Sequence, residues 1–319
     1  MLLDCLFIIV GVVLVLWGAD RLTEGAASMA RRFNVPEIVI GLTIVAAGTS
    51  APELFVSATS ALQDTPDLAV GNVVGSNIMN TLLIVGVAAM VAPMTISRST
   101  VLKDIPFSAL ASVLLIVLCL DTFDSLDLNG HVISRIDGII LLAAFALFMV
   151  YTFRVAKQSP AAEGDGDKSV MPVWKSILFV ALGLACLILG SNLFVSSASS
   201  VAEQLGVSQS IIGLTIVAGG TSLPELATSV VAARKGQSAI AIGNVIGSNV
   251  FNLLLILGTT AVICPMQIGG ITVVDISMML LSVLMVWVFS YTRYTVEKWE
   301  GALLTLTYLA YAGWLMYIA

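Results

Sequence analysis

Residues 41–53, GLTIVAAGTSAPE, recur as residues 213–225, GLTIVAGGTSLPE. Each copy ends in a glutamate, Glu53 or Glu225, that follows a long apolar run. Gly, Thr, Ser and Pro precede each glutamate, and these residues interrupt or begin helices more readily than they extend them. Ser50 and Ser222 are therefore predicted N-caps of new helices, with proline in the first turn and glutamate three residues further on.

The composition indicates that these helix breaks lie inside a membrane. Of the 319 residues 58% are hydrophobic and only 11% are charged, which is typical of a polytopic membrane protein and not of a soluble domain. A spanning helix needs about 20 mostly apolar residues. The predicted fold is all-α, with ten spans at residues 2–18, 36–62, 68–92, 101–120, 133–153, 173–199, 208–233, 239–263, 271–290 and 299–318.

The basic residues predict the orientation, because Lys and Arg concentrate in cytoplasmic loops. With the N-terminus outside, the inner loops hold 13 of the 14 Lys and Arg residues, and only Arg135 falls in an outer loop. Both termini are therefore expected outside, in a cell membrane. The formal charge of −6 reflects acidic outer loops, so nucleic acid is not an expected partner.

An internal repeat relates residues 18–94 to residues 190–266 at a constant offset of 172 residues, without a gap. Residues 71–80, GNVVGSNIMN, match residues 243–252, GNVIGSNVFN, in the same register. The predicted units are 1–153, with its motif at 41–94, and 172–319, with its motif at 213–266. Five spans per unit give the second unit the opposite topology, and such inverted repeats place the substrate near the membrane midplane on discontinuous helices.

The segment between the repeats, 154–171, is expected to be a cytoplasmic linker. Its core, AKQSPAAEGDGDKS at 156–169, is polar and rich in Gly and Asp. The DGD triplet resembles part of a calcium loop, but the twelve-residue frame and the closing glutamate are missing. The four cysteines show neither metal spacing nor a disulfide pattern, and no cofactor is expected.

The two glutamates point to a cation. An ionised residue in a spanning segment costs at least about 2.5 kcal/mol and usually marks function. Two carboxylates about 4 Å apart repel by about 4 kcal/mol at an effective dielectric of 20, so a cation or protons must compensate them. Nearby residues offer mainly oxygen, which suits Ca²⁺ and Na⁺. The side chains with such oxygens are Thr49, Ser50, Ser76, Asn77, Asn80, Thr221, Ser222, Ser248, Asn249 and Asn252, and the breaks could add the free carbonyls of Ala46 and Ala218.

Simpler interpretations exist for several of these residues. Ser50 and Glu53 could form only a capping box. The Gly-x-x-x-Gly pairs that begin at Gly71 and Gly243 are also typical of close helix packing. Asn77 and Asn249 could bind an ion or could join helices by hydrogen bonds.

Together, GTSAPE with GNVVGSNIMN and GTSLPE with GNVIGSNVFN resemble the two α-repeats of the sodium/calcium exchanger family within the cation/calcium antiporters. The resemblance covers nearly the whole chain and implies a ten-helix, prokaryotic-type member. In such a fold spans 2, 3, 7 and 8 form the ion-binding core, and spans 1 and 6 form a sliding gate. The short linker leaves no room for the large regulatory domains of animal exchangers.

The resemblance also implies roles for individual residues. Glu53 and Glu225 would bind Ca²⁺ centrally, with Asn80 and Asn252 completing the middle of the site. Potassium-dependent relatives carry Asp at the position of Asn252, so a potassium requirement is not expected. The flanking Na⁺ sites would be formed by the side chains of Thr49, Ser50, Ser76, Thr221, Ser222 and Ser248 and the carbonyls of Ala46 and Ala218.

The predicted function is Na⁺/Ca²⁺ antiport by alternating access, because one Ca²⁺ or two Na⁺ neutralise two carboxylates. A Ca²⁺/H⁺ antiporter is the alternative, since buried carboxylates that repel each other could accept protons. A cation channel would need a continuous pore lined by a ring of like groups. An intramembrane serine protease would need a Ser–His pair, and the single histidine, His131, is expected in an outer loop. The chain is therefore not expected to be an enzyme or to need an obligate protein partner.

Overall fold

The structure is a computed structural model that describes residues 2–63, 66–119, 132–158, 171–206, 218–268 and 271–318. His131, most of the linker including its DGD triplet, and residues 213–217 of the second motif lie outside these ranges. Within them the fold is helical, apart from four two-residue strands. The expectation of an all-α membrane protein is confirmed.

The helices in the described ranges overlap the predicted spans. The first repeat contains α1 (Leu2–Arg32), α2 (Glu37–Ile40), η1 (Gly41–Val45), α3 (Ala46–Thr49), α4 (Ala51–Leu62), α5 (Pro66–Ile78), η2 (Met79–Ile84), α6 (Val85–Val91), β1 (Met94–Thr95), η3 (Thr100–Asp104), α7 (Ile105–Cys119), β2 (Val132–Ile133) and α8 (Arg135–Gln158). The second contains α9 (Val173–Gln204), α11 (Ala218–Thr221), α12 (Leu223–Arg234), α13 (Ser238–Val250), η5 (Phe251–Ile256), α14 (Leu257–Ile263), β3 (Met266–Gln267), α15 (Val273–Arg293), β4 (Thr295–Val296) and α16 (Lys298–Ile318). The η elements are π-helical turns within longer helices.

Seven helices in the described ranges are long and apolar enough to cross a membrane. An eighth span is formed if the bent pair Glu37–Thr49 and Ala51–Leu62 is counted as one, with 46° between its halves. The protein is thus an integral membrane protein.

The first helix is longer than predicted, because it continues from residue 18 to Arg32. This extension buries Ala19, Leu22 and Ala26, so one face packs on protein although the segment also carries charged residues. The helix ends before Asn34, whose φ of 53° lies in the left-handed region, and Pro36 follows.

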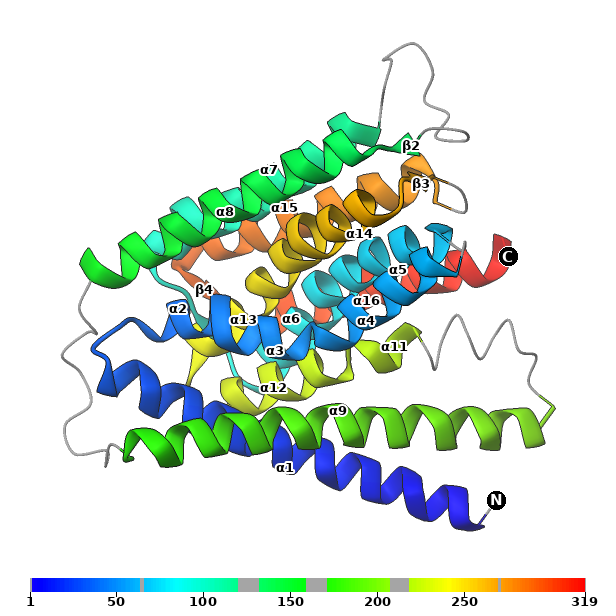
Figure 1. The fold of residues 1–319 in the computed structure, drawn as a ribbon. Helices are drawn as coiled ribbons and strands as arrows, with labels where there is room; N and C mark the ends of the chain where they lie inside the picture. Colours follow the sequence, from blue (N-terminus) through cyan, green and yellow to red (C-terminus); the bar gives the residue numbers. More distant parts are fainter. Residues whose placement is uncertain are drawn as a thin grey trace.

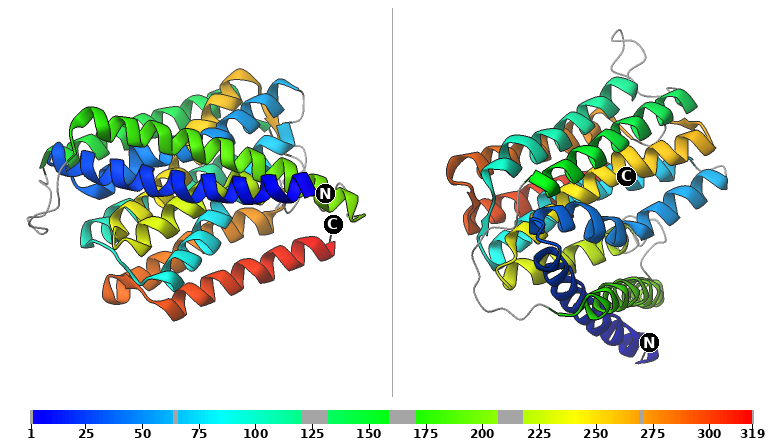
Figure 2. Two further views of the ribbon diagram at one scale, coloured as in Figure 1. Left: turned by 90° about the horizontal axis from the view of Figure 1, so that it is seen from below. Right: turned by 60° about the vertical axis from the view of Figure 1, so that its left-hand side comes forward.

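Helices α1 and α9 lie antiparallel, side by side, on one face of the other helices (Figures 1 and 2). Glycines permit their close approach. A Cβ atom on Gly18 would lie 2.8 Å from the carbonyl oxygen of Gly183, and one on Gly11 would lie 2.8 Å from that of Gly190. Gly183 and Gly190 are the repeat equivalents of Gly11 and Gly18, so the two contacts are related by exchange of the repeats.

The same reciprocity recurs elsewhere in the fold. Gly301 of α16 packs against Gly86 of α6, and Gly138 of α8 packs against Gly258 of α14. Strand β1 pairs antiparallel with β4, and β3 pairs antiparallel with β2. The last helix of each half therefore packs on the other half, and it also contacts its own half, as in the hydrogen bond from Tyr151 of α8 to Asp104.

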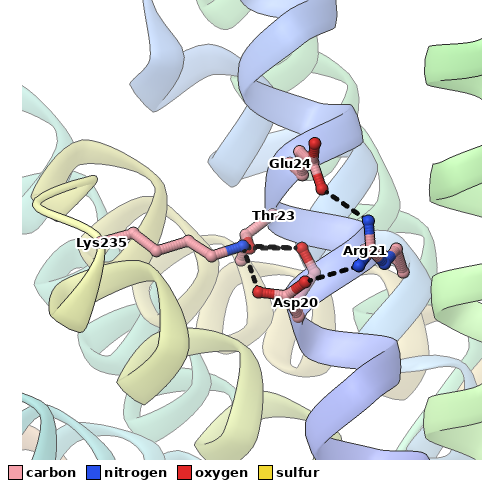
Figure 3. A network of polar contacts seen from close by, with 5 residues as sticks. All are labelled: Asp20, Arg21, Thr23, Glu24 and Lys235. Carbon is pink, nitrogen blue, oxygen red and sulfur yellow. Dashed lines mark hydrogen bonds and ion pairs between the residues drawn. The ribbon is translucent and has the colours of Figure 1, made fainter.

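A polar network joins α1 to the end of α12 (Figure 3). Lys235 Nζ lies 2.6 Å from Asp20 Oδ1 and donates to the Asp20 carbonyl at 2.9 Å and to Thr23 Oγ1 at 3.2 Å. Arg21 pairs with Glu24 at 2.9 Å and with Asp20 at 3.5 Å. The side chains of Asp20 and Lys235 are about a third exposed, so this ion pair stabilises the contact only modestly.

We expect Gly18→Leu to destabilise the protein, because the new side chain would force α1 away from α9. Overpacking of this kind costs about 1–3 kcal/mol. The melting temperature of the detergent-solubilised protein should fall by several degrees. Gly313→Leu is the control, since a Cβ at Gly313 in α16 meets nothing within 4 Å. Equal stability of the two variants would show that the α1–α9 contact is not close.

Candidate ion-binding site

The helix breaks lie where the sequence predicts them, at Ser50 and Ser222. Each serine precedes a helix with proline in its first turn, and each has a non-helical ψ of 7°. The simpler alternative, a capping box, is excluded, because neither serine side chain makes a capping hydrogen bond. Both hydroxyls instead donate across the repeat interface, Ser50 to Glu225 Oε1 at 3.1 Å and Ser222 to Glu53 Oε1 at 3.2 Å.

Hydroxyl groups gather around Glu53. Its Oε1 atom accepts from Ser76 at 3.3 Å as well as from Ser222, and the two serine oxygens are 2.9 Å apart. Thr221 is the last residue of α11 and immediately precedes Ser222. Glu53 is fully buried, so these hydroxyl groups meet its carboxylate away from the protein surface.

The repeat-related hydroxyls gather around Glu225, which is also fully buried. Ser50, Thr49 and Ser248 present their side chains to this carboxylate. Thr49 Oγ1 lies 3.5 Å from Ser248 Oγ and donates to Asn244 Oδ1 at 3.0 Å. Each carboxylate thus has hydroxyls from both repeats, and the two carboxylates are close enough to interact electrostatically.

Four asparagines, two from each repeat, connect the helices that carry this cluster. Asn80 donates to Asn249 Oδ1 at 3.2 Å, and Asn252 donates to Asn77 Oδ1 at 3.0 Å. Asn77 also donates to the Asn249 carbonyl at 3.2 Å, and Asn249 donates to Thr81 at 2.8 Å. The side-chain oxygens of Asn77 and Asn249 are therefore occupied, which favours the interpretation that these two residues join helices.

Four side-chain oxygens of the cluster accept no hydrogen bond from any described residue. They are Oε2 of Glu53, Oε2 of Glu225, Oδ1 of Asn80 and Oδ1 of Asn252, and all four are buried. They form two repeat-related pairs. A buried polar atom without a partner is costly, so a set of four such oxygens beside two carboxylates needs an explanation. A cation bound among these four oxygens would explain why they lack hydrogen-bond donors.

The π-helical turns η2 and η5 hold the two asparagines of this set. Asn80 is the second residue of η2 and Asn252 is the second residue of η5. Turns of this kind inside α-helices occur frequently at functional sites. The sequence contains no signal that predicts them.

The Ala46 carbonyl at the first break was expected to be free, but it accepts hydrogen bonds. The Ala46 oxygen accepts the Ser50 N–H at 3.0 Å, and Thr49 Oγ1 lies 3.4 Å from it. Of the second break, Ala218 begins the described part of α11. There the Gly220 carbonyl accepts from Ser191 Oγ of α9 at 2.6 Å. Side-chain hydroxyls thus satisfy part of the backbone that the breaks leave unpaired.

Asn72 and Asn244 are site residues that the sequence analysis missed. Asn244 donates to Ser229 at 3.0 Å and to the Glu225 carbonyl at 3.3 Å, and it also accepts from Thr49. Asn72 makes the equivalent bonds in the first repeat, to Ser57 at 3.2 Å and to the Glu53 carbonyl at 3.5 Å. They hold the glutamate-bearing helices in place. Both residues occupy the second position of the repeated GNVxGSN motif, and this shared position was the signal that could have identified them.

The chemistry of the cluster suits hard cations. Its potential ligands are two carboxylates, amides and hydroxyls, and such oxygens favour Ca²⁺ or Na⁺ over zinc or copper. No group of three or more His, Cys, Asp or Glu side chains in the described ranges could hold a metal ion. The site has thus at most two negative charges with which to compensate a cation.

The fold and the site define a membrane transporter for cations. Residues 4–154 and 175–317 match the family model of the sodium/calcium exchanger protein, and the chain belongs to this family of cation/Ca²⁺ antiporters. The expected membership and its class, a transporter family rather than an enzyme family, are thus shown.

Individual relatives agree with this assignment. The sodium/calcium exchanger MaX1 of Methanosarcina acetivorans is 33% identical over 347 aligned residues, covering 98% of both chains. The inner membrane protein YrbG of Escherichia coli is 38% identical over 293 residues, covering 88% of this chain and 86% of that protein. A solved structure of the sodium-calcium exchanger NCX_Mj, soaked with Na⁺ and Ca²⁺, has a TM-score of 0.82 at 30% identity and 97% coverage of both chains.

We expect Asn252→Asp to retain more Ca²⁺ binding than Asn252→Leu, because aspartate keeps an oxygen where leucine removes it. Isothermal titration of the purified variants with Ca²⁺ measures the difference. Asn249→Asp is the comparison variant, since the Asn249 oxygen already accepts a hydrogen bond. If Asn252→Leu binds Ca²⁺ as tightly as the unmodified protein, Asn252 is not an ion ligand.

Proposed function

We propose that this protein is a secondary antiporter that exchanges Na⁺ for Ca²⁺ across a cell membrane by alternating access. The observation that carries the proposal is the set of four buried oxygens without partners, on Glu53, Glu225, Asn80 and Asn252. Two carboxylate and two amide oxygens supply four ligands of a Ca²⁺ ion, which takes 6–8 oxygens. Hydroxyls or water would complete the shell.

The charge balance explains how two ions compete for one site. One Ca²⁺ neutralises both carboxylates, and so do two Na⁺. The hydroxyl groups form two clusters that would hold the Na⁺ ions, one beside each glutamate. The cluster at Glu53 would consist of Ser76, Ser222 and the adjacent Thr221, and the cluster at Glu225 would consist of Thr49, Ser50 and Ser248. The carbonyl of Ala218 would contribute a further oxygen, whereas that of Ala46 already accepts from the Ser50 N–H and from Thr49.

We further propose that ten spans form two inverted repeats, 1–153 and 172–319. The reciprocal contacts support this. Helices α1 and α9 pack through repeat-related glycines, and the repeat-related Gly86 and Gly258 contact α16 and α8, the last helices of the two halves. Residues 154–171 would be the cytoplasmic linker, and both termini would lie outside. An inverted pair gives a transporter two equivalent ways to expose one central site.

Ca²⁺ uptake into proteoliposomes tests the proposed counter-ion. We expect an outward Na⁺ gradient to drive ⁴⁵Ca²⁺ uptake, and a pH gradient without Na⁺ to drive none. Glu53→Gln and Glu225→Gln should each reduce uptake to the level of empty liposomes, because each removes one of two charges that balance Ca²⁺. Their folding is checked by size-exclusion profile.

Two results would contradict this function. Uptake driven by the pH gradient alone would identify a Ca²⁺/H⁺ antiporter instead. Undiminished exchange by either folded glutamine variant would show that the ion site lies elsewhere.

We expect the exchange to be electrogenic, with three Na⁺ per Ca²⁺, since the two hydroxyl clusters offer more oxygens than two Na⁺ need. One net charge moving through 100 mV corresponds to about 2.3 kcal/mol. In Na⁺-loaded proteoliposomes a valinomycin-set K⁺ potential that is negative inside should slow Ca²⁺ uptake, because net positive charge must leave. A Na⁺-dependent flux that ignores the imposed potential would require two Na⁺ per Ca²⁺.

A further inference from the structure

One ion pair joins α1 to the connection between α12 and α13 (Figure 3). The ammonium group of Lys235 contacts three oxygens of α1: Asp20 Oδ1 at 2.6 Å, the Asp20 carbonyl at 2.9 Å and Thr23 Oγ1 at 3.2 Å. An ammonium group has three N–H donors, so these oxygens can satisfy all of them. Lys235 is about a third exposed, but Thr23 is fully buried. The contact is therefore more specific than a single surface ion pair.

This contact lies at an end of the molecule where the helices of the ion site are packed closely together. Residues 235–237 connect α12, which carries Glu225, to α13, which carries Ser248. Helix α13 in turn packs on η1, since a Cβ atom on Gly41 would lie 3.1 Å from the Cα atom of Gly243. The basic residues predict that this end is cytoplasmic. The described conformation is thus closed at this end.

The opposite end of the repeat has no equivalent ion pair. At the offset of 172 residues the three positions of the contact hold residues that cannot form one: Asn192 for Asp20, Val195 for Thr23 and Gln63 for Lys235. Val195 has no hydroxyl group, and its side chain packs against Gly220. The two halves therefore share the residues around the ion site but differ in this charged contact.

We propose that the Asp20–Lys235 pair is a one-sided latch that favours closure of the cytoplasmic end over closure of the opposite end. The inference rests on the proposed function, because alternating access requires the cytoplasmic end to open. Opening separates α12 and α13 from η1, and the ion pair opposes this separation by holding their connection on α1. Partly exposed ion pairs contribute little free energy, so we expect the latch to change the population of the open conformation by about two- to fivefold.

Hydrogen–deuterium exchange of the purified full chain in lipid nanodiscs, without Na⁺ or Ca²⁺, measures opening at this end. We expect Asp20→Asn and Lys235→Gln each to raise the exchange rates of residues 238–247 about two- to fivefold. Arg234→Gln is the matched control. It removes an adjacent exposed charge that forms no ion pair with another described residue, and it should leave these rates unchanged.

The double variant Asp20→Asn/Lys235→Gln distinguishes the loss of one pair from two independent effects. If the two residues act as a pair, the double variant exchanges no faster than the faster single variant. Effects that multiply in the double variant would overturn the proposal. So would equal rates in Lys235→Gln and Arg234→Gln. The size-exclusion profile of each variant checks that it is folded.

Transfer of the pair to the other end tests whether the latch is one-sided. Asn192→Asp/Gln63→Lys should stabilise the opposite conformation and thus raise exchange of residues 238–247, whereas Asn192→Asp alone should not. Unchanged exchange in this double variant would overturn the proposal. None of these measurements requires ion transport. A failure of Na⁺-driven Ca²⁺ uptake would contradict the proposed function, whereas unchanged exchange rates together with normal uptake would contradict the latch alone.

Discussion

The organisation of this protein depends on two carboxylates that share one buried site. Glu53 and Glu225 are both fully buried, and two carboxylates that approached to about 4 Å would repel by about 4 kcal/mol even at an effective dielectric of 20. The surrounding serines stabilise each carboxylate through only one of its oxygens. The second oxygen of each accepts no hydrogen bond from any described residue. The described residues therefore supply only part of the stabilisation, and a bound cation, as proposed, would supply the remainder.

The hydrogen bonds explain why neither repeat makes a site alone. Ser50 donates to the glutamate of the second repeat and Ser222 donates to that of the first. The asparagine pairs, Asn80 with Asn249 and Asn252 with Asn77, cross the same interface. Because each carboxylate accepts hydrogen bonds from both halves, a displacement of one half against the other would change the surroundings of both glutamates directly.

The sequence predicted the helices and the breaks well, because both have strong local signals. Apolar runs mark the spans, and Ser-x-Pro-Glu marks the two starts. Side-chain directions at the breaks were not predictable in the same way. The same serine hydroxyl could form a capping box or donate to a residue of the other repeat. Only the packing of α4 against the second repeat decides which of these hydrogen bonds forms.

The asparagines show the same limit. Asn77 and Asn80 are three residues apart on one helix, and their sequence context does not separate an ion ligand from a residue that joins helices. The π-helical turn that begins at Met79 contains Asn80 but not Asn77, and it changes the register of the side chains. A repeat offset reveals that two positions are equivalent, but it does not reveal such a turn.

The position of α9 connects this core to the layer formed with α1. Helix α9 packs against the glycine that lies two residues before each break serine, with Leu184 against Gly48 and Val195 against Gly220. A Cβ atom at either glycine would collide with a side chain of α9. The lack of a side chain at Gly48 and Gly220 therefore lets one helix contact both breaks. Buried hydrogen bonds hold the core together. The polar link from α1 to α12 is partly exposed and weak. A buried hydrogen bond from Ser191 to the Gly220 carbonyl also ties α9 to the second break. A displacement of α9 would therefore change the packing at both breaks.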